Sequence, residues 1–171
     1  MYQSRRHLLI AACLLSASAL LWPRTAGAEH FDMTLRVEAP GAQAGEAFMD
    51  TTPPLGGVNK RPIVKVKSGQ PVRVTWRLKS GFPHGVMKKV TVHFFIVKEE
   101  ELGQKPVPDP SSDAGIVDNS YVMDFQPKSV TTGSLRFKAP EAGNYLIRVQ
   151  SEDTHEEHEH EHFSAVDLKV E

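Results

Sequence analysis

The chain has 171 residues, of which 20 are basic and 21 acidic, and 40% of its residues are hydrophobic. This length allows one domain with a substantial core, and the near balance of charge argues against a nucleic-acid-binding protein. The single cysteine, Cys13, excludes a disulfide bond within the chain.

The N-terminal residues 1–28 are predicted to be a secretory signal peptide. Arg5 and Arg6 precede an apolar run over Leu8–Trp22, and small residues follow at Ala26-Gly27-Ala28. A charged start, a short apolar core and an A-x-A-like exit are typical of a peptide cleaved during export. The apolar run is shorter than the roughly twenty residues that span a bilayer, although an uncleaved membrane anchor is the alternative.

Cleavage after Ala28 would give a mature chain of residues 29–171. Its net charge is −4, because the signal peptide carries three arginines and no acid. Cys13 leaves with the signal peptide, so the mature chain has no thiolate nucleophile or ligand. We expect a periplasmic or secreted protein without a stable membrane span, exported by the general secretory or the twin-arginine route.

Residues 29–171 show the patterning of strands and no long helical pattern. Alternating apolar and polar segments are separated by Gly, Pro, Asn and Asp, which indicates β-strands. The predicted strands are Phe31–Glu38, Ile63–Lys67, Val72–Leu78, Val90–Lys98, Tyr121–Phe125, Ser134–Lys138, Asn144–Gln150 and Ser164–Val170. Repeated short strands predict a single all-β domain, an antiparallel Greek-key β-sandwich of about seven to eight strands.

Two long connections interrupt the strand pattern. Residues 39–59 are rich in Gly and Pro, so the N-terminal segment 29–60 is expected to be irregular apart from its first strand. Residues 99–119 contain three prolines and predict a surface excursion, with one short helix at Lys98–Leu102.

Two stretches of the chain carry a family resemblance. Val64–Trp76 is a strand, a Gly turn and a second alternating strand, and Pro83-His84 follows it; Phe137–Tyr145 has the pattern Pro-x-x-Gly-x-Tyr. The first stretch resembles the opening hairpin of cupredoxin-like sandwiches. The second resembles the lead-in to their penultimate strand, and equally the tyrosine corner of immunoglobulin-like domains. The resemblance covers about residues 63–170 and implies a metal-ligand role for His84.

One departure from the cupredoxins excludes a blue-copper electron carrier. Those proteins place a Cys shortly after the Tyr of the second stretch, whereas Leu146–Gln150 contains none. A type 1 copper centre requires that thiolate. Strand alternation also predicts that Trp76 and Tyr145 are largely buried, and that His93, between the apolar residues of its strand, faces outward.

A loop rich in His and Glu, residues 153–162, lies between the last two predicted strands. His155, His158, His160 and His162 fall within eight positions, and neutral imidazole is a favoured ligand for Cu(II), Zn(II) and Ni(II). In an extended segment the last three share one face, with neighbouring Cα atoms about 6.7 Å apart. We expect these three to be the main metal ligands, with His155 and His84 as further ligands.

The sequence therefore predicts an exported, non-catalytic metal-binding β-sandwich that sequesters, delivers or senses copper, zinc or nickel. Alternating Glu and His are also compatible with a solvated turn. The alternative function is an immunoglobulin-like or fibronectin-like module that contacts another extracytoplasmic protein or a surface, with an incidental histidine loop. We find no nucleophile elbow, phosphate loop or catalytic arrangement of paired carboxylates that would indicate an enzyme.

Overall fold

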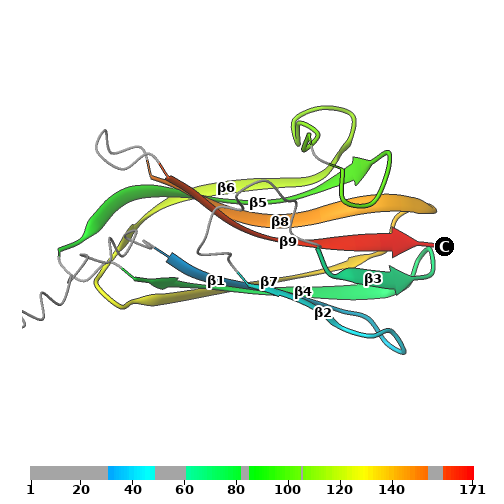
Figure 1. Cartoon of the computed structure of the whole chain (residues 1–171), viewed down its shortest axis with the longest axis horizontal. Helices are drawn as coiled ribbons and strands as arrows, with labels where there is room; N and C mark the ends of the chain where they lie inside the picture. Colours follow the sequence, from blue (N-terminus) through cyan, green and yellow to red (C-terminus); the bar gives the residue numbers. More distant parts are fainter. Residues whose placement is uncertain (1–30, 49–60, 82–84, 105, 154–159) are drawn as a thin grey trace, which may run out of the picture.

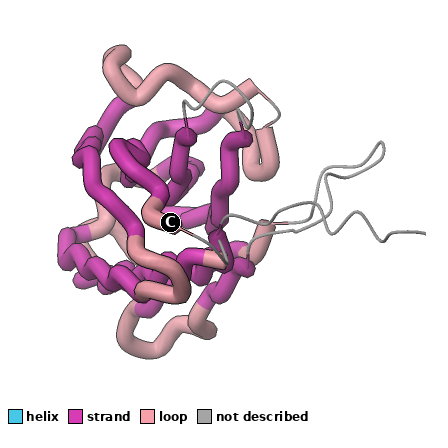
Figure 2. Tube along the Cα trace, turned by 90° about the vertical axis from the view of Figure 1, so that its left-hand side faces the viewer, coloured by secondary structure: helices cyan, strands magenta, loops and turns pink. Residues whose placement is uncertain are grey.

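The computed structural model describes residues 31–48, 61–81, 85–104, 106–153 and 160–171, except the side chains of Asp153, His160 and Glu161. All regular elements in these ranges are β-strands (Figures 1 and 2). They are β1 (Phe31–Glu38), β2 (Gly45–Phe48), β3 (Ile63–Val66), β4 (Pro71–Ser80), β5 (Met87–Glu99), β6 (Gly115–Phe125), β7 (Val130–Lys138), β8 (Gly143–Asp153) and β9 (His160–Val170). The predicted signal peptide, residues 1–28, lies outside the described residues. Among the described residues, no helix is long and apolar enough to cross a membrane.

The strands form two sheets that pack face to face, as Figure 1 shows. The first sheet has the order β2-β1-β4-β7, and the second has the order β3-β9-β8-β5-β6. All neighbouring strands are antiparallel except β3 and β9, which run parallel. The predicted all-β sandwich is confirmed, although nine strands are described, more than the seven to eight expected, and the parallel pair was not predicted.

The main core lies between the two sheets, because alternate side chains of each strand point into this space. β1 contributes Phe31, Met33, Leu35 and Val37, none of them more than 1% exposed. Strands of the second sheet contribute a facing set of fully buried residues: Val90, Val92, Ile96, Tyr145, Ile147, Val149, Val166 and Leu168. Burying a side chain of this size contributes about 1.5–3 kcal/mol, so the interlocking faces dominate stability.

Tyr145 is fully buried, as predicted. Its hydroxyl donates a hydrogen bond to the backbone oxygen of Glu141 at 2.8 Å, which fastens the corner between β7 and β8. Trp76 also faces the core but is only partly buried, because it lies beside the edge strand β7. Its ring stacks on Phe94 with centroids 4.6 Å apart and planes 12° apart. A Cβ atom on Gly133, opposite Trp76, would lie 2.1 Å from the indole, so this glycine leaves room for the ring.

Several strands extend beyond their predicted bounds. The segment 29–60 contains β2, which pairs with β1 as a hairpin. β6 begins at Gly115 where the sequence indicated Tyr121, and β9 begins at His160 where it indicated Ser164. Both strand extensions contain runs of polar residues, Asp118-Asn119-Ser120 and His160-Glu161-His162, so the sequence there lacks the apolar and polar alternation that indicates a strand.

The short helix predicted at Lys98–Leu102 is wrong. Lys98 and Glu99 are the last residues of β5, and they pair with Tyr145 and Asn144 of β8. Turns and bends follow through Gly103. Pairing with β8 satisfies the backbone of these residues, so tertiary contacts override a local preference for a helical turn.

Candidate functional site

Three pairs of consecutive strands have their joined ends at one end of the sandwich, which lies at the left of Figure 1. They are β4 and β5, joined by the β4–β5 loop (residues 81–86), β6 and β7, joined by the β6–β7 turn (126–129), and β8 and β9, joined by the β8–β9 loop (154–159). We call this the histidine end. The register of the strands fixes this arrangement, because β5 places Met87 opposite Phe125 of β6 and Thr91 opposite Glu152 of β8. The strands that flank His84 and the histidine-rich loop therefore end side by side, as expected from sandwich topology.

Among the predicted metal ligands, His162 has a described side chain. His84, His155 and His158 lie outside the described residues, and His160 is placed in β9 opposite Asp153 without a described side chain. The described residues alone contain no group of three side chains that could hold a metal ion. The ligand set expected from the sequence thus stays a prediction.

His162 is partly buried on the inner face of β9, where it precedes the core residues of that strand. It pairs with Ser151 of β8, and its ring meets the ring of Phe31 edge-on, with centroids 6.2 Å apart and planes 68° apart. Phe31 in turn packs edge-on against Phe125 at 4.8 Å. These aromatic contacts restrict the orientation of the imidazole at the mouth of the core.

Two buried serines lie next to His162. Ser151 is its cross-strand partner and Ser164 is two positions further along β9, and they are 1% and 2% exposed. Within the described part of the chain, neither hydroxyl has a hydrogen-bond partner. A hydroxyl both donates and accepts, so the two serines offer groups that can orient an imidazole or a bound water at this position.

His93 lies on the opposite, outer face of the second sheet, as predicted from the burial of Val92 and Phe94. Its Nε2 atom is hydrogen-bonded to Oδ1 of Asp118 at 2.5 Å, and its ring packs against Phe95 with centroids 4.9 Å apart. Because the sheet separates His93 from the inner face that holds His162, these two histidines cannot share one metal ion.

A buried ion cluster that no sequence pattern indicates lies on the same outer face. One guanidinium nitrogen of Arg61 lies 2.9 Å from Oε1 of Glu99, and its Nε atom lies 2.7 Å from Oδ1 of Asp167. The three side chains are 12%, 0% and 3% exposed. They come from the residues before β3, from the end of β5 and from β9, so no local motif connects them.

Burial governs the protonation of this cluster. It raises the pKa of Glu99 to about 7, against the opposing effect of Arg61, and it also raises the pKa of Asp167. The nearby Arg148 guanidinium lies 4.1 Å from the ring centroid of Phe163, and burial lowers the pKa of Arg148 to about 10. The cluster is enclosed, and we interpret it as a structural element that joins three segments.

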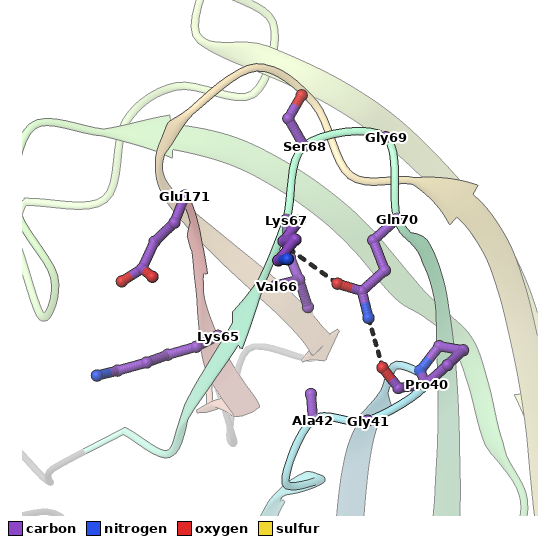
Figure 3. Close-up of a pocket in the computed structure, with 10 residues that line it drawn as sticks. All are labelled: Pro40, Gly41, Ala42, Lys65, Val66, Lys67, Ser68, Gly69, Gln70 and Glu171. Atoms are coloured by element: carbon purple, nitrogen blue, oxygen red, sulfur yellow. Dashed lines mark hydrogen bonds between the residues drawn. The ribbon is translucent and has the colours of Figure 1, made fainter.

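An open hollow of about 660 Å³ lies at the end opposite the histidine end (Figure 3). Gln70 lines one side of this hollow. Its side chain accepts a hydrogen bond from the Lys67 backbone N–H at 2.9 Å and donates one to the Pro40 carbonyl at 2.6 Å. The Glu171 backbone N–H donates to the Val66 carbonyl at 2.9 Å. These bonds hold the β1–β2 hairpin and the C-terminal residue on the β3–β4 turn, so the hollow follows from how the turns meet.

Neither models of known protein families nor curated protein sequences match this chain. Its β-sandwich architecture occurs in proteins of many functions and identifies no family.

Proposed function

We propose that this chain is an exported, non-catalytic β-sandwich that binds Cu(II), Zn(II) or Ni(II) at the histidine end. The main ligands are His158, His160 and His162, with His155 and His84 as further ligands. Such a protein would sequester, deliver or sense the metal in the periplasm or outside the cell. Its relationship to the cupredoxin-like or immunoglobulin-like domains is part of the same proposal.

The observation that carries the proposal is the shared end of the two loops that contain the histidines. The β4–β5 loop and the β8–β9 loop leave neighbouring strands of the sandwich at the same end. His160 and His162 both belong to β9, where alternate Cα atoms are about 6.7 Å apart. A transition-metal ion needs several donors that converge within about 2–2.3 Å of it. The strands that flank both histidine-containing segments end at this one end, which supports a site built from the two segments.

The charge of the histidine loop also favours a cation. Six acidic residues lie between positions 152 and 161, namely Glu152, Asp153, Glu156, Glu157, Glu159 and Glu161. Carboxylates close to a metal site attract the ion and fix imidazole tautomers. The aromatic contact between His162 and Phe31 supports one ligand from the core side.

Calorimetric titration of the untagged mature protein with each metal tests the proposal. The triple variant His158→Ala/His160→Ala/His162→Ala should lose at least about tenfold in affinity, and binding should weaken below about pH 6.5, where imidazole is protonated. His93→Ala is the matched control, because it removes a histidine from the outer face. His84→Ala separates a site made by the loop alone from one shared by both loops.

Equal metal affinity in the triple variant and the original chain would refute this site. The chain would then be better explained as an interaction module with an incidental histidine loop. Loss of affinity in the His93 variant alone would move the site to the outer face of the second sheet.

A further inference from the structure

The outer face of β4 and β7, which we call the basic face, has an unusual charge distribution. Its outward positions hold five basic residues from two neighbouring strands: Arg73, Arg77, Lys79, Arg136 and Lys138. Neither strand contains an acidic residue. This local excess of positive charge occurs in a chain that has slightly more acidic than basic residues overall.

Two of these arginines face each other directly. Arg73 of β4 and Arg136 of β7 are register partners, and both are exposed. Within the described ranges neither forms an ion pair. Like charges placed opposite each other destabilise an antiparallel pair, and an anion bound between the two guanidinium groups would offset that repulsion.

An open trough of about 580 Å³, lined by Arg73 but not by Arg136, crosses all four strands of the first sheet beside this pair. Its lining includes four short hydroxyl side chains, Thr34, Thr75, Thr132 and Ser134. Longer side chains lie beside them, namely Arg36, Arg73, Arg77, Glu46 and the ring of Phe48, which is 66% exposed. Glu46 lies 3.7 Å from Arg36, and Asp32 lies 3.9 Å from Arg77, so part of the charge is balanced at the β1 side.

We propose that this trough and the basic face bind an anionic glycan, a sugar chain that carries carboxylate or sulfate groups. Guanidinium groups bind such oxyanions through two parallel hydrogen bonds. The threonine and serine hydroxyls match the hydroxyl groups of a sugar, and the exposed Phe48 ring offers an apolar surface for a sugar ring. The proposal does not depend on metal binding at the histidine end.

Other polyanions fit this surface less well. A nucleic-acid-binding chain is usually basic overall, whereas this chain is not. A protein that docks on an anionic membrane generally inserts several apolar side chains. On the outward positions of the first sheet, the large exposed apolar residues within the described part are Phe48 and Val130.

Titration calorimetry in EDTA tests the proposal, with heparin as the sulfated glycan, alginate as the carboxylated glycan and dextran as the neutral one. The original chain should bind heparin or alginate but not dextran. Arg73→Gln/Arg136→Gln should lose at least about tenfold in affinity, as expected when two charge-assisted contacts are removed. Lys65→Gln/Lys88→Gln is the control, because it removes two exposed charges from the second sheet and should change affinity less than about twofold.

Urea unfolding of both double variants checks that each one folds as the original chain does. Equal losses in the two variants would overturn the proposal, since only overall charge would then matter. It would equally be overturned by a failure of heparin and alginate to bind at low salt. Tighter binding to phosphatidylglycerol vesicles or to duplex DNA than to either glycan would assign the face to a different partner.

Discussion

On both outer faces of the sandwich, every second side chain of a strand points outward. The face of the second sheet is partly covered by a loop, whereas the face of the first sheet is open to solvent. On the second sheet, the loop between β5 and β6 folds back over the strands, and its Val107 packs on a small apolar cluster of Phe95, Val97, Leu146 and Ala165. On the first sheet, the corresponding face is open, basic and rich in hydroxyl groups.

The difference shows what a covering loop changes. Beside the loop, whose Gly103 backbone is hydrogen-bonded to Asp167, the side chains of Arg61, Glu99 and Asp167 have little contact with solvent, so each charge needs its partner. On the open face, Arg73 and Arg136 lie opposite each other and are tolerated because water screens their repulsion. The covered face thus depends on charge pairing, because losing one partner would leave a buried charge uncompensated, whereas the charges of the open face stay in contact with water.

The largest effect on the free energy of unfolding is expected from removing the buried Arg61 of the covered face, compared with removing the exposed Arg73 of the open face. Arg61→Ala leaves two buried carboxylates without their cation and should destabilise the fold by about 3–5 kcal/mol at pH 8. Arg73→Ala removes an exposed charge and should change the free energy of unfolding by no more than about 0.5 kcal/mol. Urea unfolding measures both, and similar small values would mean that the loop does not exclude water from the cluster.

A smaller effect on the free energy of unfolding is expected from a change in pH. The pKa of Glu99 is about 7 in the folded chain and 4.5 as its ordinary value. Between these values the unfolded state loses its proton first, so stability should fall as pH rises from about 4.5 to 7, by up to about 3 kcal/mol. Glu99→Gln should remove this slope in urea unfolding measured across the window. Glu46→Gln, which removes an exposed carboxylate from the first sheet, is the matched control and should keep the slope.

The smallest effect compares one valine on each face. Val107→Ala removes two methyl groups from the contact between the covering loop and the apolar cluster, and should cost about 1 kcal/mol. Val130, on the outer face of β7, is 48% exposed, so Val130→Ala should cost less than about 0.5 kcal/mol. Thermal unfolding of the two variants provides the comparison. A larger loss for Val130→Ala would indicate that the first sheet's face is also covered.

For the candidate site, the sequence predicted the arrangement of the flanking strands. The strands on either side of the His84 segment and of the histidine-rich segment end side by side, as sandwich topology led us to expect, whereas the metal-ligand set stays a prediction. The inward position of His162 beside Phe31 was not predicted, because the alternation of β9 becomes regular only from Ser164 onward. The basic face was also missed, since its charges come from β4 and β7, which are far apart in the chain.

The sequence by itself determined the sandwich, the first strand Phe31–Glu38, the burial of Tyr145 and the outward position of His93, because each depends on local alternation along a strand. Only the tertiary structure decided the short edge strand β2, the parallel pairing of β3 with β9 and the cluster that joins Arg61, Glu99 and Asp167. These features join residues separated by turns and loops of the chain. Which residues pair depends on packing and on the need to satisfy buried charges and backbone groups. The local alternation of residues along one strand does not contain this information.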